Sequence, residues 1–299
     1  MIPTHETLDT TATRSRVVDL VELAKPRVVV MVLITTAVGF YLGSEGALDI
    51  LRLLPTLIGT GLAAAGTLAL NQFLERDVDA RMERTRHRPL PEGRIEPTDA
   101  LLLGLVVTGA GIAYLALAVN GLSALVTATT SFSYLLLYTP LKRVSPFCSI
   151  VGAVPGALPP VTGWVAARAA LGVEAWVLFA ILFLWQLPHS LAIARLYRDD
   201  YARGGIRVLP VVEPDGRSTA QQVVTNCLAL LLVGLTPTLV GLAGRGYFVC
   251  AVVLGTIFLA YGIAFARRRT ATAARHLLLA SLLYLPALLI TMAVDKTVP

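Results

Sequence analysis

Nine long apolar segments constrain the fold of this 299-residue chain more than any other feature. A helix that crosses the hydrocarbon core of a bilayer needs about 20 mostly apolar residues. The segments cover approximately residues 28–43, 51–72, 98–119, 121–139, 149–167, 174–194, 219–242, 246–266 and 277–294. Only 15% of the residues are charged, whereas a typical soluble domain has about 25%. We therefore predict an all-α, polytopic membrane protein with nine transmembrane helices around a central cavity.

The basic residues alternate between the two sides of the predicted bundle. Of the 25 Lys and Arg residues, 21 fall in the N-terminal tail and in every second connection. This asymmetry follows the positive-inside rule and predicts a cytoplasmic N-terminus. Because it accounts for most of the net charge of +6, a nucleic-acid partner is not expected. We expect one membrane-embedded domain over residues 1–299, in which residues 1–24 form a cytoplasmic tail and a short interfacial helix.

Two of the connections are long, and both belong to the arginine-rich set. They cover approximately residues 73–97 and 195–218 and follow the second and sixth spans. Long connections this dense in Asp, Arg and Pro are more often functional than mere tethers.

The fifth span is rich in Pro and Gly, which predicts a broken or bent helix. Kinked packing and the wall of a substrate cavity both remain open for that bend.

The first long connection begins with three oxygen-bearing side chains on one helix face. Asn71, Glu75 and Asp79 follow each other at four-residue spacing, so they drift by only about 80° around the helix. Such a face suits a hard cation such as Mg²⁺, which takes one or two carboxylates and completes its shell with water and phosphate. The alternative is a solvated helix end with Glu–Arg pairs.

Basic side chains gather around this acidic face. Guanidinium groups bind phosphate oxygens through two parallel hydrogen bonds, whereas an ammonium group acts as a compact positive charge. The candidate diphosphate-binding residues are Arg76, Arg84, Arg88, Lys142, Arg143 and Arg198. The alternative for each is to anchor the topology, as Lys25 and Arg27 are expected to do at the start of the first span.

Four stretches carry a resemblance to a known family. They read NQFLERDVDARMERTRHRPLPEGRI from Asn71, YTPLKRVSPFCSIVGAVPGALPPVTGW from Tyr138, LWQLPH from Leu184 and DDYARGGIRVLP from Asp199. The chain resembles the UbiA-type intramembrane prenyltransferases, and within them the heme O synthase (protoheme farnesyltransferase) branch. The resemblance extends from about Lys25 to Gln222. It departs from the branch at Cys148, Ser190 and Arg207.

The resemblance implies a second acidic site, at Asp199 and Asp200, that faces the first. Together with Asn71, Glu75 and Asp79, these residues would hold Mg²⁺ ions against farnesyl diphosphate. The implied reaction transfers the farnesyl group to a vinyl group of heme B and adds water, which gives heme O and diphosphate. The resemblance also implies a bacterial inner-membrane protein and leaves room for a heme-processing membrane partner. The positive-inside rule places both long connections on the cytoplasmic side.

One histidine within a span is assigned a role on the same resemblance. His189 would contact the heme, since histidine is a common ligand of heme iron. A lone histidine in a span is otherwise more often a packing residue. Two other functions remain as alternatives. One is a prenyltransferase that acts on an aromatic quinone precursor, which would retain both acidic loops. The other is a transporter, which would carry charged residues near mid-membrane.

Overall fold

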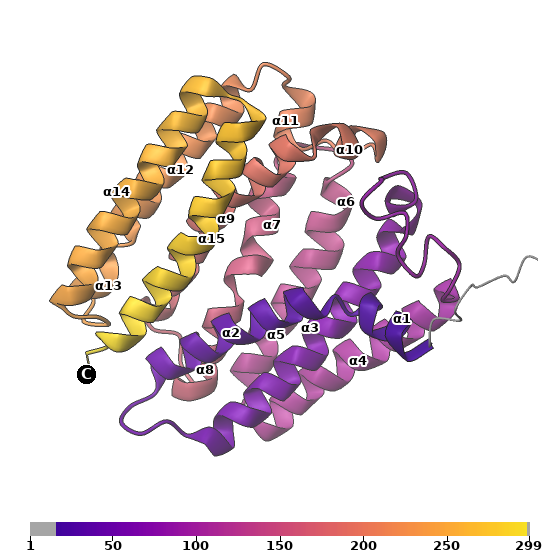
Figure 1. Ribbon diagram of the computed structural model, residues 1–299. Helices are drawn as coiled ribbons and strands as arrows, with labels where there is room; N and C mark the ends of the chain where they lie inside the picture. The colour runs from indigo at the N-terminus through magenta and orange to yellow at the C-terminus, as the bar shows by residue number, and fades with distance from the viewer. Residues whose placement is uncertain (1–15, 298–299) are drawn as a thin grey trace, which may run out of the picture.

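The computed structural model describes residues 16–297, and it is built of helices (Figure 1). Within that range, nine helical segments are long and apolar enough to cross a membrane. They are α2 (Pro26–Gly43), α3 (Ile50–Asp79), α4 (Pro97–Ala118), Gly121–Leu141, Cys148–Arg168, α9 (Val173–Leu196), Arg217–Leu239, α14 (Arg245–Arg268) and α15 (Ala271–Val294). The nine predicted spans and the all-α class are thus confirmed. The cytoplasmic position of the N-terminus stays a prediction.

Three of the nine spans are interrupted. The fourth consists of α5 (Gly121–Phe132), a π-helical turn η1 (Ser133–Tyr138) and α6 (Thr139–Leu141). The fifth consists of α7 (Cys148–Ala157) and α8 (Pro159–Arg168), and the seventh of α12 (Arg217–Val233) and α13 (Thr236–Leu239). The fifth and seventh spans resume at prolines, Pro159 and Pro237, and Pro140 follows the π-helical turn. A proline lacks the amide hydrogen that a helix interior requires. The predicted bend of the fifth span is confirmed at Leu158.

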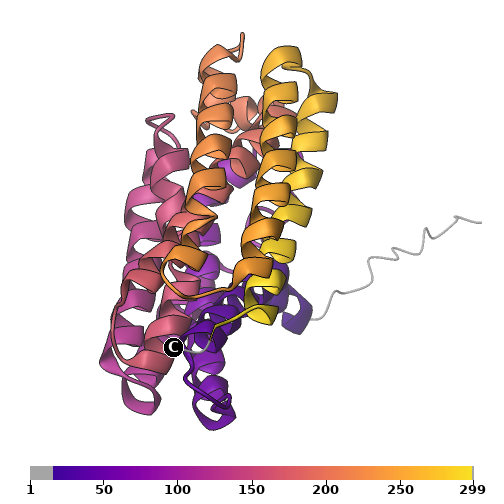
Figure 2. The same cartoon turned by 90° about the vertical axis from the view of Figure 1, so that its left-hand side faces the viewer.

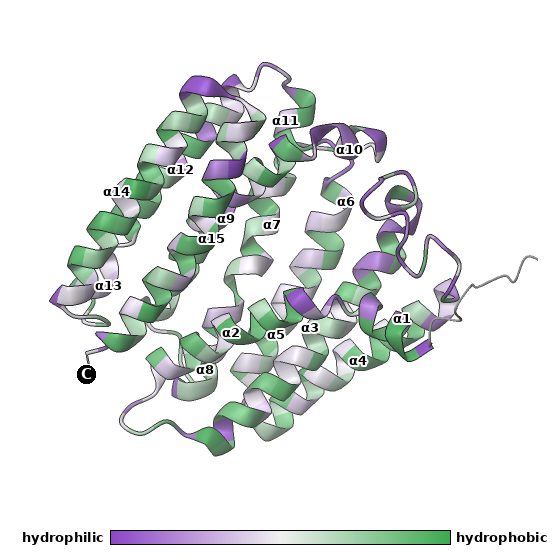
Figure 3. Cartoon of the chain, viewed as in Figure 1, coloured by the Kyte–Doolittle hydropathy of each residue, from purple (hydrophilic) through white to green (hydrophobic). Residues whose placement is uncertain are grey.

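The long helices form two neighbouring groups (Figures 1 and 2). Helices α2, α3, α4, α5 and α8 pack together on one side, and α9, α12, α14 and α15 pack together on the other. Helix α7 contacts both η1 and α9, and so joins the groups. The long helices are mainly hydrophobic along their length (Figure 3). Leu117 and Leu283 are 89% and 74% exposed, as expected where lipid is the solvent.

Short helices also lie outside the nine spans. Helix α1 (Arg16–Leu23) confirms the predicted interfacial helix as a helix, although residues 1–15 of the expected tail lie outside the described residues. Gln72 of α3 donates a hydrogen bond to the Leu23 carbonyl at 2.8 Å, which fixes the end of α1. Helices α10 (Arg198–Arg203) and α11 (Leu209–Val212) lie in the second long connection.

Glycines allow α2 and α8 to approach until their backbones touch. A Cβ atom added to Gly39 would lie 2.0 Å from the carbonyl oxygen of Pro160, and one added to Gly163 would lie 1.9 Å from that of Thr36. Because lipid supplies no hydrophobic force between helices, membrane helices associate through close contacts of this kind. In α7, Gly152 and Gly156 lie against the side chains of Tyr138 and Gln186. A cavity wall built by this span stays a prediction.

We predict that Gly163→Ala destabilises the fold by about 2 kcal/mol, because the added methyl group meets backbone that cannot rotate away. Gly109→Ala is the matched control, since a Cβ atom at Gly109 in α4 meets nothing within 4 Å. The midpoint of thermal unfolding in detergent should fall for Gly163→Ala and stay the same or rise for Gly109→Ala. Equal midpoints for the two variants would show that the α2–α8 contact is not tight.

Candidate active site

The three oxygen-bearing residues of the first acidic face lie at the end of α3 and are buried. Asn71, Glu75 and Asp79 are 1%, 7% and 1% exposed. The amide nitrogen of Asn71 donates to the Glu75 carboxylate at 3.0 Å and to the Thr139 hydroxyl at 3.1 Å. The predicted shared face is therefore present, and it is directed into the protein. The alternative of a solvated helix end is wrong for these three residues.

Each buried carboxylate of α3 has a basic partner from another segment. Lys142 Nζ lies 2.9 Å from Glu75 Oε1, and Arg88 Nη1 lies 2.6 Å from Asp79 Oδ2. Burial alone would lower the pKa of Lys142, but the negative charge of Glu75 helps to hold it well above its ordinary value. Two residues predicted to bind diphosphate thus stand at the acidic face, where they neutralise it.

Lys25 completes this group and was not predicted as a site residue. Its Nζ donates to Asn71 Oδ1 at 2.9 Å. Burial, and secondarily the positive charge of Arg88, lowers the pKa of Lys25 to about 7. In the sequence, Lys25 was indistinguishable from a topology anchor, because a basic residue before the first span satisfies the positive-inside rule. Only the docking of the start of α2 beside the end of α3 reveals its place.

The π-helical turn adds two tyrosines that the sequence analysis also missed. The Tyr134 hydroxyl lies 3.4 Å from Asn71 Oδ1, and Lys142 Nζ lies 4.3 Å from the centre of the Tyr138 ring. Both side chains come from η1. Single π-helical turns occur frequently at functional sites. Helical periodicity in the sequence gives no signal for such a turn, since it changes the register of the helix locally.

The two residues of the second acidic pair lie in different environments. Asp200 is buried, and its carboxylate accepts hydrogen bonds from the backbone amides of Glu83 (2.7 Å) and Arg84 (3.4 Å) and from the Arg203 guanidinium (2.8 Å). Burial would raise the pKa of Asp200, but these hydrogen bonds hold it below its ordinary value. Asp199 is exposed. The contacts of Asp200 favour a role in joining the two loops, whereas the Asp199 carboxylate faces solvent.

The two long connections therefore meet at the same end of the bundle. A pocket of about 420 Å³ lies between them, lined by Glu83, Arg84, Leu196, Tyr197, Asp199, Asp200 and Arg203. The Arg84 guanidinium lies over the rings of Tyr197 and Tyr201, at 5.4 and 5.9 Å from their centres. An apolar cluster of Val78, Met82 and Ile206 draws on both connections.

The short connection that follows the fourth span is also bonded to the second long connection. The backbone amide of Arg207 donates to the carbonyl of Lys142 at 2.7 Å, so the segment that carries Lys142 is tied to the second long connection. The acidic face of α3 and the Asp199 pocket thus share one set of loops. The side of the membrane on which they open stays a prediction.

Other predicted residues lie away from the acidic face. Arg76 stacks on Phe73, with 4.7 Å between its guanidinium carbon and the ring centre, and Arg143 donates to the Leu74 carbonyl at 3.3 Å. Arg198 is the first residue of α10. His189 lies within α9, and its Nδ1 atom is 2.8 Å from the Ser281 hydroxyl of α15. Helical spacing predicted that Asn71, Glu75 and Asp79 share one face, but the sequence could not show which arginines reach it.

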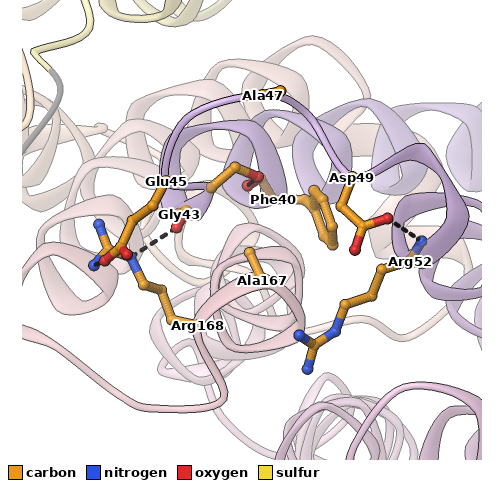
Figure 4. Close-up of a pocket in the computed structure, with 9 residues that line it drawn as sticks. Phe40, Gly43, Glu45, Ala47, Asp49, Arg52, Ala167 and Arg168 are labelled. Atoms are coloured by element: carbon orange, nitrogen blue, oxygen red, sulfur yellow. Dashed lines mark hydrogen bonds and ion pairs between the residues drawn. The ribbon is translucent and has the colours of Figure 1, made fainter.

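A second pocket lies at the opposite end of α3 and carries different chemistry (Figure 4). It has a volume of about 270 Å³. There, Arg168 pairs with Glu45 and donates to the Gly43 carbonyl at 2.7 Å, while the Asp49 side chain accepts from the amide of Arg52 at 3.0 Å. These bonds tie the α2–α3 connection to α8 and cap α3.

The donors at the end of α3 fit a cation that is completed by its substrate. Within residues 16–297, no group of three or more His, Cys, Asp or Glu side chains is close enough to form a metal site by itself. Two carboxylates and one amide oxygen do stand on one face, however. Mg²⁺ typically takes one or two carboxylates and fills its remaining positions with water and substrate phosphate. The set from Asn71, Glu75 and Asp79 has that composition.

Two kinds of sequence comparison point to the same family. The chain matches the UbiA prenyltransferase family over residues 32–286. It is 50% identical to a protoheme IX farnesyltransferase from Solibacter usitatus over 287 residues, which cover 93% of this chain and 98% of that protein. It is 45% identical to a protoheme IX farnesyltransferase from Koribacter versatilis, with 94% of each chain covered.

Solved structures share the fold. A digeranylgeranylglyceryl phosphate synthase structure matches with a TM-score of 0.80 at 15% identity, covering 93% of this chain and 98% of that one. A UbiA homolog from Archaeoglobus fulgidus, bound to DMAPP and Mg²⁺, matches with a TM-score of 0.65 at 17% identity, covering 92% of this chain and 99% of that one. The nine apolar helices found within residues 16–297, together with the UbiA family match, indicate an integral membrane protein.

We predict that Asp199→Asn and Asp200→Asn have different effects on the loops. Asp200→Asn removes a charged acceptor from two backbone amides and Arg203, so the arginine-rich segment between Ala80 and Glu96 should open and be cut faster by trypsin. Asp199→Asn removes an exposed carboxylate and should leave the cleavage rate unchanged. The rate is measured by mass spectrometry of the fragments. Equal cleavage rates in both variants would contradict the role of Asp200 in joining the two long connections.

We also predict strong coupling between Glu75 and Lys142. Lys142→Met leaves Glu75 buried without its cationic partner, which costs about 3–5 kcal/mol. Adding Glu75→Gln removes the unpaired charge, so the double variant should recover most of the lost stability. Unfolding midpoints of the wild type, both single variants and the double variant measure the coupling. If the two effects simply add, the pair is not the buried interaction described above.

Proposed function

This chain belongs to the UbiA prenyltransferase family, and from that membership we propose that it transfers a farnesyl group from farnesyl diphosphate to a vinyl group of heme B. Water is added in the same reaction, and the products are heme O and diphosphate. The observation that carries the proposal is the buried face of Asn71, Glu75 and Asp79, with Lys142 and Arg88 paired to it. The choice of acceptor rests on the relatives that are named protoheme IX farnesyltransferase, at 50% and 45% identity over nearly the whole chain.

The basic residues of the site are placed to receive a diphosphate. Lys142 and Arg88 are bonded to carboxylates, and both can exchange a carboxylate oxygen for a phosphate oxygen. Lys25 adds a third positive group, since an arriving anion favours its protonated form. Arg84, held over two tyrosine rings at the pocket between the loops, can contact the outer phosphate. We place Arg143, Arg76 and Arg198 outside the direct contacts.

Magnesium would be held by Asn71, Glu75 and Asp79, with Asp199 as the carboxylate of the second site. When bound, it neutralises negative charge on the leaving diphosphate. The protein's own cations, Lys142, Arg88 and Lys25, would neutralise the same charge. Asp200 then acts by holding the amides of Glu83 and Arg84, which fixes the loop that carries Arg84 and Arg88.

The proposed chemistry breaks the allylic C–O bond of farnesyl diphosphate, and diphosphate leaves with the electron pair. The vinyl group of the heme then attacks C1 of the farnesyl cation. Water captures the new cation beside the porphyrin ring and loses one proton, which leaves a hydroxyl group. The farnesyl cation needs apolar surroundings, so we place it in the predicted central cavity, deeper in the membrane than the polar residues of the two long connections. The two long connections, which are bonded to each other, limit the access of bulk water to the cation.

We further propose a bacterial inner-membrane protein that forms one domain over residues 1–299. Both long connections would face the cytoplasm, as the excess of basic residues predicts. A heme-processing partner in the same membrane is part of the proposal. The transporter and quinone-precursor alternatives are outcomes of the test below.

We predict that Asp79→Ala lowers turnover by at least about 100-fold. The negative charge that develops on the leaving diphosphate then loses part of the ligand set that stabilises it. Membranes with the overproduced protein are supplied with farnesyl diphosphate, heme B and Mg²⁺. Heme O is measured by mass spectrometry and released diphosphate by an enzymatic assay. The inactive variant should still reside in the membrane fraction in normal amounts.

Three outcomes would contradict the proposal. Full activity of Asp79→Ala would remove the role of the acidic face. Diphosphate release with an aromatic quinone precursor, and none with heme B, would assign the sister activity. Absence of any diphosphate release, together with movement of a solute across the membrane, would indicate a transporter.

A further inference from the structure

The pocket at the start of α3 plays no part in the proposed chemistry and lies at the other membrane surface. Arg52 lines that pocket and precedes Glu75 by 23 positions in the same helix, or about 35 Å along the helix axis. The hydrocarbon core of a bilayer is about 30 Å thick. If Glu75 stands at one membrane surface, Arg52 therefore stands at the opposite one, at the level of the lipid headgroups.

Arg52 brings an unpaired guanidinium group to this pocket (Figure 4). Its backbone amide is bonded to Asp49, but its side chain has no hydrogen bond or ion pair with any residue of the range 16–297. Arg52 is only partly exposed. A guanidinium group presents its N–H donors in a planar fork that matches the oxygens of a phosphate group. The free side chain therefore favours an anionic group as the ligand.

Asp49 supplies a negative group in the same pocket. Its Oδ1 atom accepts the hydrogen bond from the Arg52 amide, whereas its Oδ2 atom has no partner in the described part of the chain. Glu45 and Arg168, the other two charged residues of the lining, are paired with each other. The lining thus has no net charge, and it leaves one cation and one carboxylate oxygen available to a ligand.

The pocket adjoins a lipid-facing stripe of α3. Leu51, Leu54 and Ile58 are 86%, 52% and 52% exposed, and they share one face of the helix. Arg52 follows Leu51 directly, about 100° further around the helix, so it borders this stripe. The pocket volume of about 270 Å³ is just below the roughly 300–1,000 Å³ of sites that enclose whole small ligands. A ligand whose head enters the pocket and whose acyl chains follow α3 fits both features.

The charges of the lining select among lipid headgroups. A headgroup that carries one charge of each sign leaves the pocket neutral, whereas an anionic headgroup leaves Asp49 Oδ2 without a partner. The nearby Lys296 does not change this balance. Its Nζ atom donates to the carbonyls of Tyr41 and Ser44, where it offsets the negative end of the α2 helix dipole.

We propose that this pocket binds the headgroup of a phospholipid with a phosphodiester and a primary ammonium group, as in phosphatidylethanolamine. Arg52 binds the phosphodiester and Asp49 Oδ2 binds the ammonium group, each through charge-assisted hydrogen bonds. Phosphatidylcholine has no N–H group to donate, and phosphatidylglycerol has no positive group. The proposal is independent of the proposed function, because the pocket lies at the other end of α3.

Native mass spectrometry of the full-length protein in detergent tests the proposal. The protein is titrated separately with phosphatidylethanolamine, phosphatidylglycerol and phosphatidylcholine, and the dissociation constant of the first bound lipid is recorded. The wild type should bind phosphatidylethanolamine at least about ten-fold more tightly than the other two lipids. Arg52→Gln should weaken that binding by about ten-fold, as expected for loss of hydrogen bonds to a charged group.

Asp49→Asn tests the contact with the ammonium group. Asparagine caps a helix about as well as aspartate does, so α3 keeps its first hydrogen bond while the negative charge is lost. The variant should bind phosphatidylethanolamine no more tightly than phosphatidylcholine.

Arg245→Gln is the matched control for Arg52→Gln. Arg245 is exposed at the start of α14, next to Gly244, whose amide is bonded to the Asp295 carbonyl beside Lys296. It therefore lies at the same end of the bundle as the pocket, but it does not line it. Arg245→Gln should leave the lipid affinities unchanged. Unfolding midpoints of all three variants without added lipid should match the wild type, which shows that the fold is intact.

Two results would overturn the proposal. Equal affinities for the three lipids in the wild type and in Arg52→Gln would show that lipids only coat the apolar surface. A rise in the unfolding midpoint with inorganic phosphate that equals the rise with phosphatidylethanolamine, and that is lost in Arg52→Gln, would assign a site for free anions instead.

Discussion

The cost of burying charge governs the polar end of this protein. Two carboxylates on the last turns of α3 are almost entirely shielded from solvent, and an isolated charge there would be prohibitive. Lys142 and Arg88 offset that cost, and each arrives on a different loop. The loops are consequently held where the carboxylates require them. A substrate that brings its own negative charge can take over these cations and release the carboxylates for a metal ion.

Much of the fold could be predicted from the sequence, because a membrane leaves few choices. An apolar run of sufficient length must form a helix, and the nine predicted runs coincide with the nine spans observed in the described part of the chain. The shared face of Asn71, Glu75 and Asp79 followed from helical spacing alone. The break in the fifth span followed from its prolines. These features depend on local chemistry, which the sequence states directly.

The contacts between segments could not be predicted, since they depend on which helices become neighbours. Lys25 resembled a topology anchor until α2 docked beside the end of α3. Asp200 resembled its neighbour Asp199, yet the structure directs one to the backbone of the first loop and the other to solvent. The partner of His189 is 92 residues away in the chain. Helical spacing carries no information on such pairs.

The central claim is that the buried face of α3 holds a divalent cation only together with a diphosphate. Electron paramagnetic resonance of Mn²⁺, used in place of Mg²⁺, tests it most directly with the purified protein and a non-hydrolysable farnesyl diphosphate analogue. We expect a protein-bound Mn²⁺ signal that requires the analogue, shows coupling to phosphorus and disappears in Glu75→Gln. A bound signal that persists unchanged in Glu75→Gln would contradict it.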